Sequence, residues 1–355
     1  MRKVVAASLL FPALLLAVSC SSRGGGSMTF GDVTIVDDFP EVMELDAGSA
    51  EIVNLDVPGI IDIISRDSIL MAVSTREAPI VSLFEYSTLR PRGEFMRHGN
   101  GPKELLPFYM PTGYESRFFH QNDSLFVDIV NGNKNTLRWN VSSAYCDSLE
   151  RVSEMPPISA AASLFSWRLN DSTVLSRRLE NSSTQLVRCL YVNGKLQTPS
   201  FLEELNKAEI DTPNNGYMIN ILSSLVGYNP KSDIVADIAI VLDVINLYSL
   251  SSDFRRTIQL AKKPMSIEKA ETTVKLTSRL PRSIWYAAPY DDFFAVLYGR
   301  EEQREILLFS WNGVPLCKYI LHEPVSAFDI NGNCLLVLDS DSETIHKYQI
   351  KNPGR

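Results

Sequence analysis

The sequence has 355 residues, 45% of them hydrophobic, and this length and composition are ordinary for a globular protein with a sizeable core. Its formal net charge of −8 argues against nucleic-acid binding, which needs a basic face, and against electrostatic adhesion to anionic lipid. We therefore expect no nucleic-acid partner.

Residues 1–19 have the anatomy of a secretory signal. Two basic residues precede an apolar run over residues 4–18, which small residues close just before Cys20. The run is shorter than the roughly 20 residues that span a bilayer as a helix. The cysteine at the exit makes the signal similar to that of a bacterial lipoprotein, so we expect cleavage before Cys20 and a lipid on that residue. The alternative is an ordinary signal peptide with a chance cysteine, which Ala17 favours, because lipoprotein signals prefer leucine there.

Residues 20–29 are predicted to form the lipidated cysteine and a flexible tether. Three consecutive glycines among serines cannot pack, and a lipid-anchored domain needs such a spacer from the membrane. The membrane is then a partner through the lipid on Cys20, and the folded domain covers residues 30–355. No acidic residue directly follows the cysteine, which favours the periplasmic face of the outer membrane for this exported chain.

From residue 30 onward the pattern indicates strands separated by turns. Short runs of β-branched and aromatic residues are bounded by Asn, Asp, Gly and Ser, and three Asn-Gly pairs supply the positive φ of hairpin corners. The predicted strands cover residues 33–36, 60–64, 69–73, 80–86, 124–129, 173–176, 186–192, 234–240, 245–250, 293–298, 306–311, 335–338 and 345–350. Helical patterns are confined to residues 201–210 and 264–280, so the chain is predicted to be all-β.

The strands group into pieces of the size of four-stranded propeller blades. The pieces cover residues 50–97, 106–153, 158–203, 216–261, 282–321 and 324–350. The last piece lacks a strand, and residues 32–38 form a spare one, so we expect this N-terminal strand to pair near residues 345–350 and close a six-bladed β-propeller. The alternative, two stacked β-sandwich domains, lacks a linker between residues 40 and 350. We expect a single propeller domain and a monomer.

Three stretches carry a family resemblance. Residues 97–105 contain a GxGPxE pattern, residues 234–250 form a pair of apolar strands, and residues 306–316 have the pattern of an aromatic hairpin, ILLFSWNGVPL. On these motifs the chain resembles the six-bladed TolB-like β-propeller lipoproteins of Bacteroides and relatives. The resemblance implies the propeller fold and a lipid anchor, and it implies no particular activity, since the family has no common one.

The glycine-rich stretch in the first motif is predicted to be a structural turn between blades. A phosphate-binding loop would need a helix after its glycines, and Pro102 and the residues that follow do not supply one. We expect Gly99 and Gly101 to adopt unusual φ angles, Pro102 to fix the exit, and Glu104 to accept hydrogen bonds from backbone amides.

Candidate catalytic and metal-binding residues are sparse. The histidines are His98, His120, His322 and His346. Their spacing fits no metal motif, and the sequence has no GxSxG nucleophile elbow. The four cysteines after Cys20 form no CxxC; we expect buried thiols, although an exported protein could pair them. Acidic pairs at residues 37–38, 291–292 and 339–341 are interpreted as solvated turns in preference to glycosidase carboxylates. No cofactor or metal is predicted, and a non-enzyme is favoured.

Four Asp-Ser pairs precede an apolar residue or threonine. Their serines are Ser68, Ser124, Ser148 and Ser172. The pattern resembles the O-glycan acceptor of exported Bacteroides proteins, and it is equally typical of a turn that enters a strand. Both interpretations stay open.

The leading functional hypothesis is a binding or interaction module. Propeller loops converge on one face, so we expect a protein or saccharide ligand at the rim or mouth of the central channel. The runner-up is a hydrolase or lyase that acts on saccharide through carboxylates and a histidine in that channel, and a third possibility is a purely structural component. Convergence of carboxylates with His120 in one cleft would favour the enzyme.

Overall fold

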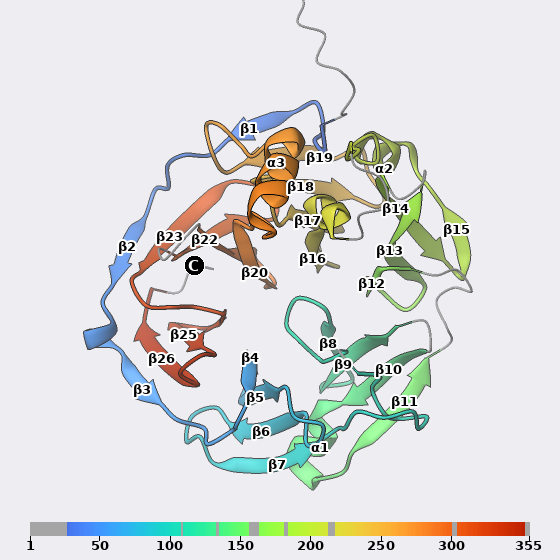
Figure 1. Ribbon diagram of the computed structural model, residues 1–355. Helices are drawn as coiled ribbons and strands as arrows, with labels where there is room; N and C mark the ends of the chain where they lie inside the picture. Colours follow the sequence, from blue (N-terminus) through green and yellow to red (C-terminus); the bar gives the residue numbers. More distant parts are fainter. Residues whose placement is uncertain are drawn as a thin grey trace, which may run out of the picture.

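The computed structural model of the chain describes residues 27–107, 109–132, 135–155, 163–180, 184–211, 217–299 and 304–351. In this part of the chain, six sheets surround a central axis, each with four antiparallel strands, and two of them carry a fifth strand. Figure 1 shows the ring closed, with the blue N-terminal segment beside the red C-terminal strands. The fold is the predicted six-bladed β-propeller. Cys20 and the predicted signal lie outside the described residues.

The first three blades follow one another along the chain, each from an inner strand at the channel to an outer strand at the rim. Blade 1 consists of β4 (Ile60–Arg66), β5 (Ile69–Ser74), β6 (Val81–Glu85) and β7 (Pro91–Phe95). Blade 2 consists of β8 (Arg117–Gln121), β9 (Ser124–Asn131), β10 (Asn135–Asn140) and β11 (Arg151–Met155). Blade 3 consists of β12 (Phe165–Arg168), β13 (Thr173–Glu180), β14 (Gln185–Val192) and β15 (Lys195–Gln197).

The other three blades complete the ring. Blade 4 consists of β16 (Ser224–Asn229), β17 (Ile234–Ala239), β18 (Val244–Ser249) and β19 (Arg255–Gln259). Blade 5 consists of β20 (Ile284–Pro289), β21 (Phe293–Tyr298), β22 (Arg304–Ser310) and β23 (Pro315–Leu321). Blade 6 consists of β24 (Ala327–Asn331), β25 (Cys334–Asp339), β26 (Thr344–Gln349) and the N-terminal β3 (Glu51–Val53). Every strand predicted from the sequence is present, with bounds that differ by a few residues.

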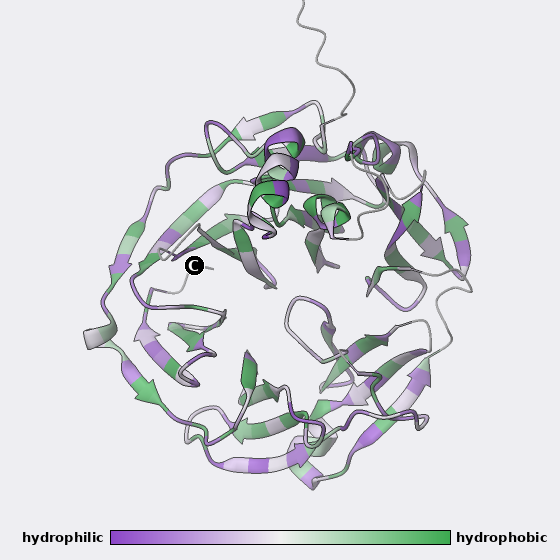
Figure 2. Ribbon diagram, in the orientation of Figure 1, coloured by the Kyte–Doolittle hydropathy of each residue, from purple (hydrophilic) through white to green (hydrophobic). Residues whose placement is uncertain are grey.

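Turn chemistry explains where the strands end. Asn193 and Gly194, between β14 and β15, have φ angles of 50° and 74°, and Gly332, between β24 and β25, has a φ of 60°. Asparagine and glycine occupy this left-handed region at little cost, which is why these pairs mark hairpin corners. Burial differs between the strands of a blade: in blade 1 the middle strands β5 and β6 are buried on both faces, whereas most of the outer β7 is exposed or half-buried. Figure 2 shows β5 and β6 as hydrophobic and the outer β7 as largely hydrophilic.

The N-terminal segment forms a belt of three short strands along the outer rim. β1 (Val33–Ile35) pairs in parallel with β19 of blade 4, and β2 (Val42–Leu45) pairs in parallel with β23 of blade 5. β3 then pairs antiparallel with β26, with Val53 opposite Ile345, and so completes blade 6. The ring is therefore closed by an N-terminal strand, as expected.

The expected identity of that closing strand is wrong. Residues 32–38 do not reach blade 6, because apolar side chains on either side of β1 hold it on blades 4 and 5. Phe30 and Val36 are 2% and 6% exposed, and the Phe39 ring lies 5.4 Å from the Phe309 ring, edge to face. Burial of these side chains adds to the three-residue pairing of β1 with β19, and β3, further along the belt, closes the ring.

The described fold begins before the predicted domain boundary at residue 30. Met28 is 2% exposed, its carbonyl accepts a hydrogen bond of 3.0 Å from Asn246 Nδ2, and the Thr257 hydroxyl accepts one of 2.8 Å from Phe30 N. The C-terminal boundary predicted for the tether, residue 29, therefore lies inside the folded domain, because Met28 is packed into the propeller.

Helices occupy connections between strands. α3 (Ile267–Thr277) falls within the predicted helical region 264–280, and α2 (Ser200–Leu205) overlaps the predicted region 201–210 but begins one residue earlier. Two short 3-10 turns cover Ala47–Ser49 and Met218–Leu222. α1 (Val141–Asp147) was not predicted; the Asn140 side chain caps its first turn. Among the described residues, no helix is long and apolar enough to span a membrane.

The cysteines after Cys20 differ in their surroundings. Cys189 and Cys317 are buried, Cys334 is half-buried, and all four described cysteines are free. The expectation of buried thiols is wrong for Cys146, which is exposed in α1, because the segment folds as a helix on the outer part of blade 2 and not as an apolar strand.

Candidate functional site

The inner strands of all six blades surround one cavity, at the end of the channel where these strands finish. Its volume is about 550 Å³, within the range of roughly 300–1,000 Å³ that small-ligand sites occupy. Each blade contributes to its wall, in chain order through Arg66, His120, Trp167, Tyr228, Tyr290 and Asn331. The residues combine aromatic rings with charged groups, which is the composition of a binding site more than of a packed core.

The loop before β8 lines one side of this cavity. Figure 1 shows it beside β8, directed toward the centre of the ring. Gly113 N donates a hydrogen bond of 2.8 Å to Asp62 Oδ2, and Trp167 Nε1 donates one of 3.2 Å to Tyr114 O, which tie the loop to blades 1 and 3. A Cβ at Gly113 would lie 2.4 Å from the Tyr286 hydroxyl oxygen, so only glycine allows this close approach.

Asp62 lies beneath the cavity and is 1% exposed. Its Oδ1 accepts hydrogen bonds from Ile63 N at 2.8 Å and from the Tyr286 hydroxyl at 2.7 Å, in addition to the bond from Gly113. Burial raises the pKa of Asp62 to about 7, against the opposing effect of these three donors. A carboxyl group that titrates near neutrality therefore supports the loop that lines the cavity.

A second buried carboxylate, Asp329 on β24, joins blades 1, 5 and 6. It accepts hydrogen bonds from Ser65 N at 2.6 Å, from the Ser65 hydroxyl, and from the Tyr290 hydroxyl at 3.0 Å. It also pairs with Arg66 Nη1 at 3.2 Å. The Arg66 guanidinium lies 5.7 Å from the Phe118 ring and 5.5 Å from the Tyr290 ring, so two aromatic faces of the cavity hold one cation.

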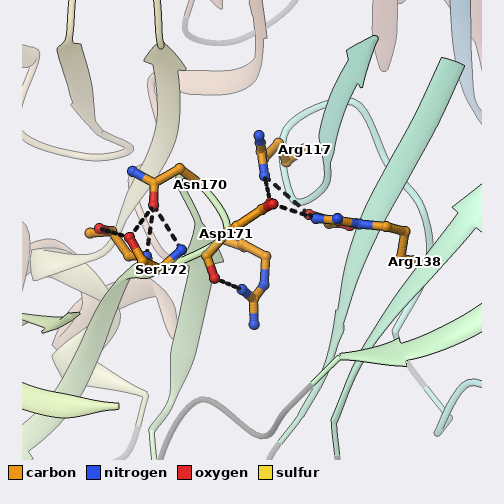
Figure 3. Close-up of polar contacts among 8 residues, drawn as sticks. Arg117, Arg138, Asn170, Asp171 and Ser172 are labelled. Atoms are coloured by element: carbon orange, nitrogen blue, oxygen red, sulfur yellow. Dashed lines mark hydrogen bonds and ion pairs between the residues drawn. The ribbon is translucent and has the colours of Figure 1, made fainter. Parts of the chain in front are cut away.

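Arg117 and Arg138 bridge blades 2 and 3 through two aspartates. Arg138 donates from Nε and Nη2 to Asp128, at 2.6 and 2.7 Å, and from Nη2 to Asp171 Oδ1 at 2.8 Å. Arg117 Nη1 lies 3.1 Å from Asp171 and 3.3 Å from Asp128. Figure 3 shows both arginines reaching from blade 2 toward Asp171, which lies in the turn after β12. Both guanidinium groups also lie close to the Phe119 ring, 4.2 and 4.7 Å from its centre.

Arg168, at the end of β12, stands beside this network and lines the cavity. Arg168 is 7% exposed, and its Nη1 donates a hydrogen bond of 3.0 Å to the backbone carbonyl of Asp171. Burial lowers the pKa of Arg168; Asp128 and Asp171 oppose this effect, and the neighbouring arginines add to it.

Of the four histidines, His120 is the one in the cavity wall. Its Nε2 lies 2.7 Å from Asp67 Oδ2, and the two side chains are 52% and 63% exposed, so the pair lies at the rim. Asp291 and Glu115 also contribute to the wall, and burial raises the pKa of Glu115. Carboxylates and His120 thus share one cleft. No group of three or more His, Cys, Asp or Glu in the described ranges is arranged to hold a metal ion.

The glycine-rich motif forms a turn after β7. Gly101 N donates a hydrogen bond of 2.7 Å to Glu104 Oε2, and Glu104 Oε1 pairs with Arg97 Nε at 2.9 Å. The expectation of unusual φ angles is wrong, since neither Gly99 nor Gly101 has a positive φ. The physical reason for both glycines is close approach: a Cβ would lie 2.1 Å and 2.8 Å from Glu104 Oε2, respectively. Pro102 lies in this turn, and none of Gly99, Gly101, Pro102 and Glu104 lines the cavity.

Three of the four Asp-Ser pairs lie in turns at the end of an inner strand. Ser68, Ser124 and Ser172 begin the second strand region of blades 1, 2 and 3, and Ser148 ends α1 with a left-handed φ of 55°. Ser68, Ser148 and Ser172 are exposed and Ser124 is half-buried. The Ser172 hydroxyl donates a hydrogen bond of 3.0 Å to Asn170 Oδ1, as Figure 3 shows. These serines have the turn role that the sequence allowed, and modification of them stays a prediction.

The cavity arginines were not identified from the sequence. A usable signal was present, because the Asp-Ser turns mark the ends of inner strands and Arg66 and Arg168 lie just before two of them. Inner-strand ends of a propeller meet at one mouth, so charged residues there converge although they are far apart in sequence. Sequence spacing alone could not place Asp329 beside Arg66.

Comparisons with known proteins address the fold. No protein-family model matches the sequence, and no curated protein matches it. Among solved structures, the chain is similar to a member of the DUF4221 family from Bacteroides vulgatus, with 13% identity, a TM-score of 0.50, and coverage of 86% of this chain and 100% of that one. It is also similar to a protein of Bacteroides fragilis that is described as exported, with 13% identity, a TM-score of 0.46, and coverage of 90% and 99%. At these identities the likeness to the DUF4221 protein shows a common fold, and the ligand of the cavity has to be argued from its residues.

Proposed function

We propose that this chain is a lipid-anchored binding module of the cell envelope that takes its ligand at the mouth of the central channel. The observation that carries the proposal is the cavity of about 550 Å³ to which all six blades contribute. Aromatic rings and arginines in its wall supply the apolar surface and the few oriented polar groups that small-ligand sites combine. The resemblance to TolB-like lipoproteins supports the lipid anchor.

A cavity-filling variant tests the binding role. Ser116 is half-buried in the loop that lines the cavity, and Ser153 is exposed on the outer strand β11. Labelled wild-type protein, Ser116→Phe and Ser153→Phe are screened on glycan and peptide arrays. We expect ligands that bind the wild type and Ser153→Phe to be lost from Ser116→Phe. Ligands that bind all three proteins equally would place recognition outside the cavity and overturn the proposal.

The second candidate function is a hydrolase or lyase that acts on saccharide, and the pairing of His120 with Asp67 in the cavity wall favours it. A matched control exists, because His322 pairs with Glu44 at the same 2.7 Å and is similarly exposed but does not line the cavity. If the protein hydrolyses or cleaves ligands found on the arrays, the enzyme hypothesis predicts that His120→Asn loses this activity and that His322→Asn keeps it in full. Equal activity of both variants would contradict it.

The anchor is tested at Cys20, with Ser21 as the neighbouring control position. We expect the wild type and Ser21→Ala to partition with membranes after cell fractionation and Cys20→Ala not to do so, because the diacylglyceryl group supplies the two chains that stable anchoring needs. Membrane partitioning of Cys20→Ala equal to the wild type would contradict the anchor and leave the cavity argument untouched.

A further inference from the structure

Arg168 is a buried cation without a carboxylate partner. It is 7% exposed, its Nη1 bonds to a backbone carbonyl, and its Nε is buried with no hydrogen-bond partner among the described residues. Arg188 shows how another buried arginine of this protein is neutralised. Its side chain is 1% exposed, and its Nε and Nη2 donate hydrogen bonds of 2.6 and 3.3 Å to the Asp237 carboxylate. Burying a charge is costly unless it is paired, so Arg168 lacks a counter-ion.

The local charge has an excess of one positive unit. Arg117, Arg138 and Arg168 lie around Asp128 and Asp171, and among the described residues both aspartates form their ion pairs with the first two arginines. Because three cations meet two anions, one monoanion would balance the group, whereas a dianion would reverse its sign.

The acidic residues of the wall, Asp67, Glu115 and Asp291, form no ion pair with Arg168 in the described part of the chain. Asp67 is paired instead with His120 at the rim. A second buried cation, Arg177, lies 4.4 Å from the Trp167 ring and adds positive potential behind the cavity wall. The blade 2 and blade 3 side of the cavity is therefore the side that attracts an anion.

The same side offers flat apolar surface. Trp167 precedes Arg168 in β12, and Tyr114, Phe118 and Phe119 belong to the loop before β8 and to β8. Tyr228 and Tyr290 add aromatic surface from blades 4 and 5. The Ser116 hydroxyl, also in the wall, is buried with no hydrogen-bond partner in the described chain. A ring can stack on such side chains while its polar substituents reach the remaining groups.

We propose that the cavity binds a small monoanion, a carboxylate carried on a six-membered ring, with the carboxylate at Arg168 and the ring against the aromatic wall. A planar guanidinium matches a carboxylate in charge and geometry. The inference rests on the proposed binding function and names its ligand class. Two sources share this chemistry, a carboxylated sugar and an aromatic acid.

Matched pairs of probes test the proposal. D-glucuronate is compared with D-glucose, and benzoate with benzyl alcohol, by ligand-observed NMR titration of the full-length protein. We expect the carboxylate of at least one pair to bind about 10- to 100-fold more tightly than its neutral partner, as a charge-assisted hydrogen bond implies. The pair that shows the preference identifies the source as sugar or aromatic acid.

Variants at Arg168 assign the preference to this residue. In Arg168→Gln the ratio of the two affinities should fall to about 1 while the neutral probe binds as before, which also shows that the variant is folded. Arg168→Lys keeps the positive charge but lacks the planar guanidinium, so it should give an intermediate ratio of affinities. If Arg168→Gln does not fold, the ratio measured for Arg168→Lys tests the proposal in its place. Arg151→Gln, at an exposed arginine of β11, should keep the full ratio.

Three results would overturn the inference. Equal binding of charged and neutral probes, or a preference that survives in Arg168→Gln, would mean that Arg168 does not receive a carboxylate; the binding function would stand. Failure of all four probes to bind would also overturn the ligand class, and the cavity-filling experiment would then decide the binding function by itself.

Discussion

Four aspartates on inner and second strands are almost fully removed from water. Asp62, Asp128, Asp237 and Asp329 are 0–2% exposed, and each accepts at least two hydrogen bonds. Three of them pair with an arginine, whereas Asp62 has only backbone amides and a tyrosine hydroxyl. The missing cation explains why burial dominates at Asp62 and raises its pKa to about 7.

Replacement of Asp62 by asparagine should change how stability depends on pH. Because the pKa is raised in the folded protein, the folded state holds the proton more tightly than the unfolded chain does. This contribution is complete below about pH 4 and is lost as the pH rises toward and past 7. We expect the stability of the wild type relative to Asp62→Asn to fall by roughly 1–4 kcal/mol over this range.

Urea unfolding of both proteins at several pH values between 4 and 8 measures this difference. Glu150→Gln, at an exposed carboxyl, is the control and should differ from the wild type by a constant amount. A constant difference between the wild type and Asp62→Asn as well would show that Asp62 does not titrate in this window.

Gly113 should not tolerate a side chain. A Cβ there would lie 2.4 Å from the Tyr286 hydroxyl oxygen, so alanine must displace the loop or the ring, at a cost of about 1–3 kcal/mol. Gly31 has no atom within 4 Å of the corresponding position and is the matched control. Thermal unfolding of Gly113→Ala and Gly31→Ala compares them, and equal melting temperatures would contradict the close packing.

At the scale of elements, β-branched composition and turn residues were sufficient to predict the strands and the number of blades. The pairing of the belt was not predictable in the same way. Glu51–Val53 is too short to be recognised as a strand, and β1 is held in place by the burial of Phe30 and Phe39 on partners more than 200 residues away. α1 was missed because its valine, tyrosine and cysteine suit a strand, whereas the Asn140 cap selects a helix.

The closing strand β3 offers a test with its control in the same strand. Val53 is 2% exposed and Ile52, its neighbour on the opposite face, is 58% exposed. Val53→Asp buries an unpaired carboxylate against β26 and should cost about 3 kcal/mol or more, whereas Ile52→Asp should cost less than about 1 kcal/mol. Urea denaturation of both variants measures this, and equal losses would mean that β3 is not required for closure.

At the scale of the whole molecule, the ring makes every blade depend on two neighbours. Blade 6 holds blades 1 and 5 through Asp329, which bonds to Ser65 and Tyr290. The candidate site also depends on the closed ring, because residues from all six blades form its wall. Sequence reasoning could therefore predict the mouth of the channel as the site, but not which charged side chains meet there, since that depends on ring geometry.

Removal of blade 6 should abolish cooperative folding. A chain that ends at Leu321 leaves β3 without a partner and opens the faces of blades 1 and 5, so we expect no single urea transition by tryptophan fluorescence. A chain that ends at Lys351 keeps every described strand and should unfold as the wild type does. A cooperative transition at the wild-type midpoint in the shorter chain would show that the remaining blades are self-sufficient.

The belt also sets the timing of folding during synthesis. β1, β2 and β3 leave the ribosome first, yet they pair with strands near residues 257, 318 and 345. At the usual rate of about 5–20 residues per second, these N-terminal segments wait on the order of tens of seconds for their partners. Throughout that interval the apolar side chains of Met28 and Phe30 have no complete surface to cover them. A chain whose translation stops early can never complete the ring, and it stays open to proteases that the finished propeller resists.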